Sequence, residues 1–128
     1  MTLDFTKKCD IIITMKIKKL NEINPEIPQM QGTKDTTIQW LIAKSDGANH
    51  YAMRLFTIEP GGKIPLHAHH DMEHEIFIVE GEAVLNTGEV DIPVKKGDVL
   101  LIQPNDKHGF TNISTTPFKC ICVIPILK

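Results

Sequence analysis

Hydrophobic residues recur along this chain in short runs that are separated by turn residues. Apolar or alternating runs of about four to eight residues, bounded by glycine, proline, asparagine and aspartate, predict β-strands. No stretch after Met15 keeps a helical period over three turns, so the pattern predicts an all-β protein. The predicted strands are residues 15–20, 37–43, 51–58, 75–79, 83–87, 90–94, 98–102, 108–111 and 118–125.

Two of these strands, within residues 76–79 and 121–124, are apolar on both faces. A strand with one face in water alternates with polar residues. We therefore expect one face to line a closed interior and the other to pack on a second sheet or another subunit. A jelly roll of two antiparallel sheets does this, and its interior can hold a ligand. A five-stranded barrel of the oligonucleotide-binding type is the competing fold, but it would use fewer strands and need a basic, aromatic face.

The composition supports a single globular domain without a polyanionic partner. The chain has 128 residues, 14 basic and 16 acidic side chains and 5% aromatic residues, with no basic cluster. A nucleic acid partner is therefore not expected, and no apolar run approaches the roughly 18 residues that a membrane span needs. We predict an N-terminal extension over residues 1–14 and one domain over residues 15–128. The odd cysteine count (Cys9, Cys120 and Cys122) argues against a disulfide framework and favours a reduced, cytoplasmic setting.

Histidine is the residue type that points to chemistry. His67 and His69 are two apart and project to one face of an extended chain, while His74 and His108 each open a later strand. Burying four imidazoles without a partner would be costly, whereas neutral imidazole is a good ligand for first-row divalent metals. We therefore predict a metal site. His50 is interpreted as a surface residue, and His70, on the opposite parity to His69, as loop surface or a residue behind the ligands.

The same histidines lie in a pattern that resembles the two sequence motifs of the cupin superfamily. The resemblance covers about residues 52–125 and implies a single-domain cupin jelly-roll barrel. It rests on Gly61, His67, His69, His74 and Gly81 for the first motif and on Gly97, Pro104, His108 and Asn112 for the second.

The chain departs from the usual cupin pattern in two places. His74 stands where most cupins have glutamate, so the chain is similar to the small four-histidine cupins. This similarity implies the ligands His67, His69, His74 and His108, with Mn or Fe as common metals, and a homodimer. In the second motif Asn105 replaces a glycine. Asparagine tolerates a left-handed conformation, so we expect the turn to form.

Four neutral ligands predict a site that favours anionic oxygen donors. The charge of a divalent ion stays uncompensated, which makes the ion a stronger Lewis acid than one held by a carboxylate. Six-coordination would leave two positions for water, substrate or dioxygen. Imidazole ligands also suit Ni, Zn and Cu. Four imidazoles can instead close a tetrahedron around a structural zinc ion, and that alternative remains open.

Strand parity suggests which other side chains line the interior. Phe118 and Cys122 share a face of the last strand, and Phe110 follows His108 by two positions. Cys122 is interpreted as a small core residue rather than a reactive one. Arg54 shares parity with apolar neighbours, so it is expected to bind a substrate carboxylate or to form a structural ion pair.

These features favour a metal-dependent oxygenase or dioxygenase acting on a small enolisable, phenolic or unsaturated substrate. A redox-silent isomerase or lyase would use the ion only as a Lewis acid. A non-catalytic cupin that binds a small molecule is the alternative from another functional class.

Overall fold

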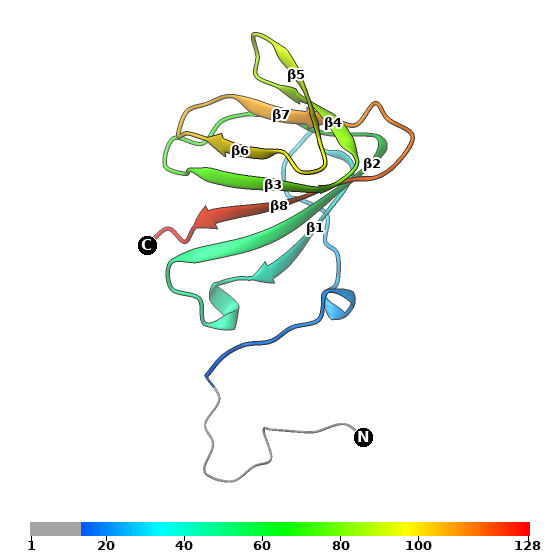
Figure 1. The fold of residues 1–128 in the computed structure, drawn as a ribbon. Coiled ribbons are helices and arrows are strands. Elements are labelled where there is room, and N and C mark those ends of the chain that lie inside the picture. Colours follow the sequence, from blue (N-terminus) through cyan, green and yellow to red (C-terminus); the bar gives the residue numbers. More distant parts are fainter. Residues whose placement is uncertain (1–13) are drawn as a thin grey trace.

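Eight antiparallel strands make up most of residues 14–128, the part of the chain that this computed structural model describes (Figure 1). The all-β prediction is confirmed, and the seven predicted strands after residue 50 all occur. The strands are β1 (Lys34–Ile42), β2 (Tyr51–His67), β3 (His74–Glu80), β4 (Glu82–Asn86), β5 (Asp91–Lys95), β6 (Val99–Ile102), β7 (His108–Thr111) and β8 (Phe118–Pro125).

The strands form one curled sheet in which β2 belongs to both layers. The order is β5-β4-β7-β2-β8-β3-β6, and β1 pairs with β2 from outside this path. The first part of β2 pairs with β8 between residues 51 and 58, and its last part pairs with β7 between residues 63 and 67. The two predicted antiparallel layers are therefore continuous through β2, and together they close a jelly-roll barrel (Figure 1).

A glycine in the middle of β2 lets β1 approach closely. A Cβ atom on Gly62 would lie 2.7 Å from the Lys34 carbonyl oxygen and 2.8 Å from that of Asp35, so a larger residue would push β1 away. The β1–β2 register shifts at the same point, between Lys34 and Thr36, as in a β-bulge. Residues 60–62, predicted as a turn, instead lie within β2, which is why β2 continues to His67.

The core lies between the two layers and follows the predicted strand parity. On β8 the buried residues alternate with half-buried ones, and the buried set is Phe118, Cys120, Cys122 and Ile124. Ile58 on β2 and Ile78 on β3 are fully buried against this set. Alternate residues of β2, β3 and β8 thus share one apolar interior.

Asn112 fastens the connection between β7 and β8. Its side chain is fully buried, and its amide nitrogen donates to the carbonyl oxygens of Ile58 and Thr116 at 2.9 Å each. Its amide oxygen accepts hydrogen bonds from the backbone and hydroxyl of Ser114 at 2.9 and 2.7 Å. The asparagine of the second motif is therefore a structural residue that fixes the chain after β7.

The segment before β1 does not contain the strand predicted over residues 15–20. It has no strand pairing there, and only a 3-10 turn at Leu20–Glu22. Ile17 is 78% exposed and Leu20 is 51% exposed, so the alternation that suggested a strand has no partner to bury its apolar side. The predicted extension over residues 1–14 lies, except for residue 14, outside the described residues.

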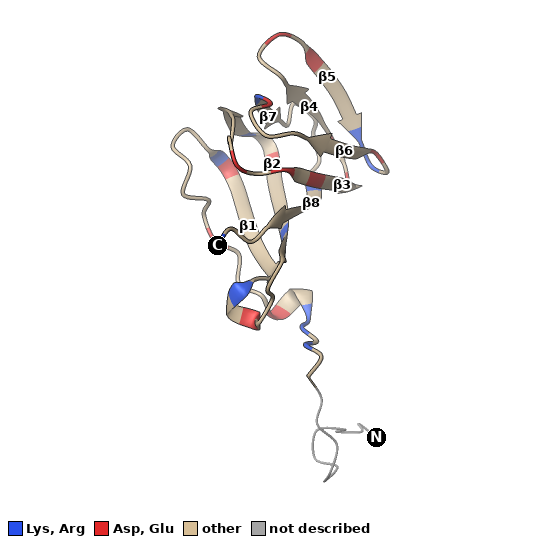
Figure 2. Ribbon diagram, turned by 90° about the vertical axis from the view of Figure 1, so that its left-hand side faces the viewer, with Lys and Arg blue, Asp and Glu red and all other residues tan. Residues whose placement is uncertain are grey.

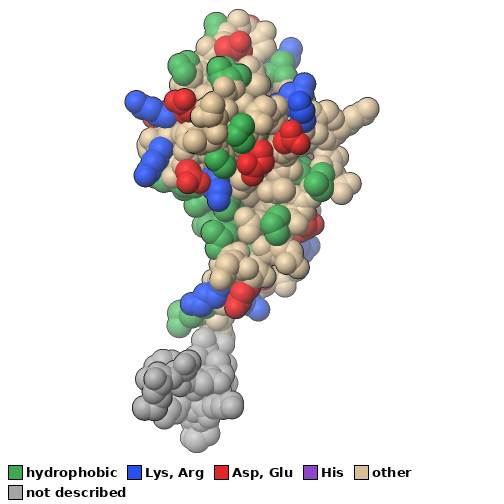
Figure 3. Space-filling model, turned by 90° about the vertical axis from the view of Figure 1, so that its right-hand side faces the viewer, with side chains coloured by type: hydrophobic (Ala, Val, Ile, Leu, Met, Phe, Trp, Pro, Cys, Tyr) green, Lys and Arg blue, Asp and Glu red, His purple; other side chains and the backbone are tan. Residues whose placement is uncertain are grey.

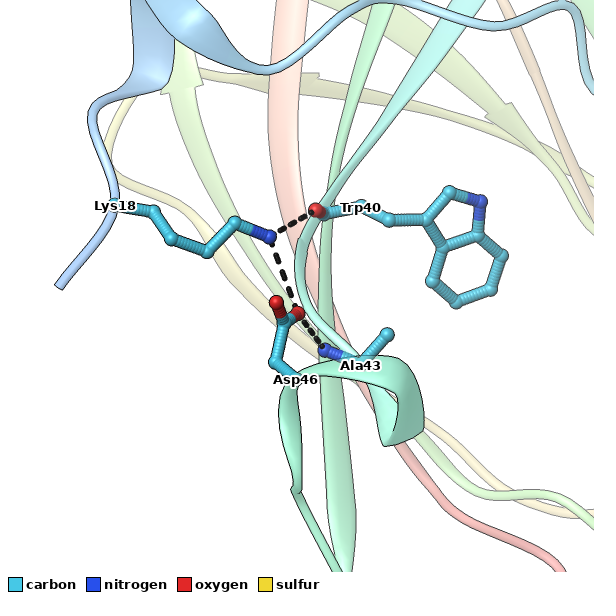
Figure 4. A network of polar contacts seen from close by, with 4 residues as sticks. All are labelled: Lys18, Trp40, Ala43 and Asp46. Carbon is cyan, nitrogen blue, oxygen red and sulfur yellow. Dashed lines mark hydrogen bonds and ion pairs between the residues drawn. The ribbon is translucent and has the colours of Figure 1, made fainter. Parts of the chain in front are cut away.

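A lysine in this segment links it to the end of β1. The Lys18 ammonium donates to the Trp40 carbonyl oxygen at 3.3 Å and to the Asp46 carboxylate at 3.1 Å (Figure 4). The same carboxylate oxygen accepts a hydrogen bond from the Ala43 backbone at 2.9 Å. That backbone contact, and then Lys18, lower the pKa of Asp46. The network ties residue 18 to the 3-10 turn Lys44–Asp46 that follows β1.

Charged side chains of both signs are interspersed over the barrel. Figure 2 shows acidic and basic residues distributed among several strands and turns, and Figure 3 shows hydrophobic side chains lying between charged ones on another face. On the face that Figure 3 shows, basic side chains lie among acidic and hydrophobic ones and do not form a continuous basic surface. Within residues 14–128, no helix has the length and apolar character needed to cross a membrane.

Candidate metal centre

Two of the four histidines face each other across the pairing of β2 and β7. His67 ends β2 and His108 begins β7, and the two residues are register partners whose ring centroids lie 4.2 Å apart. Gly109 permits this approach, because a Cβ atom there would lie 2.8 Å from the Ile64 carbonyl oxygen and 2.9 Å from the Leu66 nitrogen. The glycine that follows His108 therefore brings β7 against β2 at the site.

His69 is held near this pair by the turn of the second motif. The Asn105 backbone nitrogen donates to the His69 carbonyl oxygen at 2.7 Å, and Asn105 has the expected left-handed backbone with φ of 72°. The rings of His67 and His69 lie 5.0 Å apart between centroids. One ligand nitrogen from each of His67, His69 and His108 lies within 4.8 Å of the others, as a shared metal ion requires.

Backbone carbonyls set the tautomer of two of these rings. The Nδ1 atom of His67 is 2.8 Å from the Pro65 carbonyl oxygen, and that of His108 is 2.9 Å from the Asp106 carbonyl oxygen. A carbonyl oxygen can only accept, so each Nδ1 carries the proton and each Nε2 keeps its lone pair. A neutral imidazole with a free Nε2, oriented through Nδ1, is the form that binds a metal.

His74 lies beside this group, but it is not among the three residues whose ligand nitrogens lie within 4.8 Å of one another. It begins β3, is 4% exposed, and its ring centroid is 5.0 Å from that of His108 and 5.3 Å from that of His69. Its Nε2 atom is buried and has no hydrogen-bond partner. A buried nitrogen left unpaired is costly in the folded protein, and a metal ion is the partner that this donor set fits.

Burial favours the uncharged form of these rings. It is the largest cause of the lowered pKa values of His69, His74 and His108, and it brings the pKa of His74 to about 3. The neighbouring imidazoles lower these pKa values further, because positive charges would repel one another. The three rings are therefore neutral near pH 7, and no proton has to leave them before a metal binds.

The histidines open onto a cavity inside the barrel whose walls are mostly apolar. Of the predicted pocket residues, Phe110, Cys122 and Arg54 line it. Phe118 does not; it is fully buried behind Phe110, with ring centroids 5.6 Å apart. The lining residues are Pro28, Met30, Thr33, Arg54, Phe56, Ile64, His67, His69, His74, Ile76, His108, Phe110, Cys120 and Cys122.

Arg54 and Cys122 stand directly behind His74. The Arg54 Nη2 atom donates to the Cys122 sulfur at 3.1 Å and lies 3.5 Å from His74 Nδ1, which is itself 3.4 Å from that sulfur. If His74 is to present a lone pair on Nε2, its Nδ1 must carry the proton and donate it to the sulfur. Burial raises the pKa of the Cys122 thiol in spite of the adjacent Arg54 guanidinium. Cys122 thus acts as a neutral acceptor that both neighbours share.

The lining residues that were not predicted from the sequence include Pro28, Met30 and Thr33, in the segment before β1. No motif marks them, and their contribution depends on how this segment folds back over the barrel. The two remaining histidines lie apart from the centre. The His70 side chain is 86% exposed and 3.9 Å from the Asp71 carboxylate, and His50 is exposed in the loop before β2.

Comparison with known proteins places this site in context. Residues 54–124 match the family described as the cupin domain. A protein of Thermotoga maritima named oxalate-binding protein is 31% identical over 119 residues, which span 89% of this chain and 97% of that protein.

Two solved structures share the architecture. The polyketide cyclase RemF from Streptomyces resistomycificus has a TM-score of 0.83 and 30% identity, with 87% of this chain and 79% of that one covered. A predicted oxalate decarboxylase from Thermotoga maritima has a TM-score of 0.77 and 26% identity, with 88% and 100% covered.

Proposed function

This chain belongs to the cupin domain family, and from that premise we propose that it is a metal-dependent oxygenase or dioxygenase for a small molecule. The substrate would be an enolisable, phenolic or unsaturated compound. The ion would be held by His67, His69, His74 and His108. The observation that carries the proposal is the buried His74 Nε2 atom without a partner, next to three imidazole nitrogens that lie within 4.8 Å of one another.

Mn or Fe is the proposed metal, ahead of Ni, Zn and Cu. A divalent ion bound by four neutral nitrogens supplies Lewis acidity toward anionic oxygen donors and, for a redox-active metal, a place for dioxygen. Replacing His74 by glutamate would lower that excess charge by one unit. Elemental analysis of the wild type and of His74→Glu tests whether the fourth imidazole sets the choice of metal.

The protein's own contribution is orientation and exclusion of water. The Pro65 and Asp106 carbonyl oxygens hold the rings of His67 and His108 in place. Phe56, Ile64 and Phe110 form apolar walls that keep water from a bound substrate. No carboxyl group is found among the described lining residues, so the described cavity wall offers no carboxylic acid or base for proton transfer. This favours oxygenation over an isomerisation that depends on a side-chain acid and base.

Oxygen consumption by the metal-loaded protein tests the proposal. Acetoacetate serves as an enolisable probe and 3,4-dihydroxybenzoate as a phenolic one. We expect uptake with at least one of them, its loss in His67→Ala, and no change in His50→Ala, which alters an exposed histidine. Full metal occupancy without uptake from a wider panel of enols, phenols and alkenes would contradict an oxygenase.

A redox-silent function is the second candidate, because two relatives that are 31% and 30% identical to this chain have names without an oxygenase activity. One is called an oxalate-binding protein and the other a polyketide cyclase. Conversion of a substrate under argon would favour a Lewis-acid lyase or isomerase. A rise in the unfolding temperature with a ligand, without any product, would favour a binding protein.

We also propose a homodimer in a reduced, cytoplasmic setting. The support for the dimer is an outer apolar strip on β3, β6 and β8. It consists of Phe77, Val99, Leu101, Ile121 and Val123. The support for a reducing compartment is that Cys120 and Cys122 are buried free thiols.

A further inference from the structure

The cavity carries a positive charge that its own walls do not neutralise. Among the described lining residues Arg54 is the one permanently charged side chain, and none is acidic. The four imidazoles contribute no negative charge in either protonation state. An uncompensated guanidinium inside an apolar cavity is unfavourable unless a bound anion balances it.

The contacts of Arg54 show that this charge has no counterion among residues 14–128. Its guanidinium lies between two aromatic rings, 5.6 Å from the centroid of Trp40 and 5.0 Å from that of Phe56. Its hydrogen bond goes to the Cys122 sulfur. The ion pairs within residues 14–128 do not include Arg54; they are Lys18–Asp46, His70–Asp71 and Lys119–Glu80. The structural ion pair that the sequence left open is therefore not formed in this part of the chain.

The unpaired polar atoms point to the kind of ligand that would complete the cavity. Three buried side-chain atoms of the described residues have no hydrogen-bond partner: Thr33 Oγ1, Arg54 Nε and His74 Nε2. All three residues line this cavity. Arg54 Nε and the Thr33 hydroxyl are donors, whereas His74 Nε2 fits a metal. The ligand must therefore bring acceptor oxygens for the donors and an oxygen for the ion.

We infer that Arg54 binds the carboxylate of the substrate, which is a small carboxylic acid with a second oxygen function that reaches the metal. This inference rests on the proposed metal site and names the substrate class for it: dicarboxylates and hydroxy or oxo acids. A planar guanidinium fixed between two rings matches a planar carboxylate, with Nε and an Nη atom as paired donors.

The position of Arg54 relates the two anchoring points. Its Nη2 atom is 3.5 Å from His74 Nδ1, so the guanidinium stands next to a metal-ligand candidate and not at the far end of the cavity. Because Arg54 lies on the Nδ1 side of His74 and the proposed ion on the Nε2 side, a ligand that contacts both would have to reach past the His74 ring.

Calorimetric titration with matched probes tests this inference. Malonate and succinate are compared with malonamate and succinamate, in which one carboxylate is replaced by an uncharged amide of the same size. We expect the metal-loaded wild type to prefer the dicarboxylates by about tenfold to a hundredfold, as for a hydrogen bond to a charged group. Arg54→Gln should remove the preference and leave monoamide affinity unchanged, while Arg54→Lys should keep part of it. Lys119→Gln, which removes a half-exposed lysine on β8, serves as the control.

The outcomes separate this inference from the proposed function. Metal content and circular dichroism are measured first for every variant, and Arg54→Lys replaces Arg54→Gln if the latter does not fold. If the protein binds metal but the wild type shows no preference, or the Arg54 variants keep it in full, the inference is wrong and the metal site stands. If the protein binds no metal, the same titration is made on the metal-free protein. An Arg54-dependent preference for malonate there supports the carboxylate site and refutes the metal proposal alone; its absence refutes both.

Discussion

Both faces of β3 carry large apolar residues, and the outer face also carries Glu75, but the two faces have opposite environments. Ile76 and Ile78 point inward and are 6% and 0% exposed, whereas Phe77 between them points outward and is 47% exposed. The outer apolar strip continues from Phe77 onto the paired strands β6 and β8 through Val99, Leu101, Ile121 and Val123. Val99 is 73% exposed and Leu101 is 56% exposed. The inner face is closed by the chain itself and carries the histidines, while no segment within residues 14–128 covers the outer face.

This difference shows what an apolar pattern can and cannot indicate. Both faces satisfy the same hydrophobic pattern, but only the inner one meets the chain's own strands. A row of exposed apolar residues on paired strands is typical of an interface rather than of a solvated surface. Mutations on the inner face should therefore impair metal binding without changing the oligomeric state, and mutations on the outer face should do the reverse.

The largest expected effect is a double dissociation between the faces. His108→Ala should abolish stoichiometric metal binding, because it removes one of the three nitrogens that lie within 4.8 Å of one another, and it should leave the dimer intact. Leu101→Lys should convert the dimer to a monomer, because it places a charge on the β6 side of the outer apolar strip, and it should leave metal content unchanged. Elemental analysis and light scattering measure the two properties on the same samples.

A lysine elsewhere on the surface provides the control for Leu101→Lys. Ile113 follows β7, lies outside the outer apolar strip and is 77% exposed, so Ile113→Lys should change neither property. A wild type that is monomeric at all concentrations would contradict the dimer. A Leu101→Lys protein that stays dimeric would place the interface on another face.

A smaller effect is expected from the inner face behind the ligands. Cys122→Val replaces the thiol by a somewhat larger apolar side chain and removes the acceptor for His74 Nδ1, which lies 3.4 Å from the sulfur. Loss of a group that orients a metal-binding histidine typically lowers metal affinity by about tenfold to a hundredfold. Competition with a fluorescent chelator measures the dissociation constant.

Two further variants make this result specific. Cys122→Ser restores an acceptor and should recover most of the affinity. Cys120→Val changes the neighbouring thiol on the same face of β8, which has no hydrogen bond to a histidine among the described residues, and should have little effect. Equal losses in Cys120→Val and Cys122→Val would point to general packing of β8 rather than to orientation of His74.

The sequence predicts the barrel well because strand parity and turn residues are local signals. The predicted limits of residues 108–111 and 118–125 coincide with β7 and β8, and the inward face of β8 follows directly from alternation. The order of strands in the sheet was not predicted. It depends on how β2 bends near Gly62 so that its two parts pair with different strands, which is a property of the whole barrel.

The candidate site could be predicted only as far as its motifs reach. His67, His69 and His108 are brought together, because their spacing fixes which strand ends they occupy. The position of Arg54 between Trp40 and Phe56, and the contribution of Thr33, depend on contacts with β1 and the segment before it. Such contacts between segments distant in sequence leave no periodic signal. The same limit explains the error at residues 15–20, where alternation was present and a partner strand was not.

The smallest expected effect concerns the pH dependence of stability in the metal-free protein. Burial lowers the pKa of His74 from 6.5 to about 3. Between these two pH values His74 is therefore protonated in the unfolded chain and neutral in the folded one. The contribution of neutral His74 to the free energy of unfolding is therefore fully present above pH 6.5 and is lost as the pH drops toward 3. The slope from this residue is at most about 1.4 kcal/mol per pH unit. Urea unfolding between pH 7.5 and 4.5, followed by the fluorescence of Trp40, measures the slope.

His74→Gln isolates this contribution from the general effect of acid. Glutamine does not titrate, so the variant should be less sensitive to acid than the wild type, whatever its stability at pH 7.5. His70→Gln, which changes a histidine whose side chain is 86% exposed, should keep the slope of the wild type. Because the outer apolar strip contains no histidine, Leu101→Lys should also keep that slope if both proteins are compared as monomers. Acid sensitivity would then arise from the inner face alone. An unchanged slope in His74→Gln would show that His74 is not buried and neutral in the folded protein.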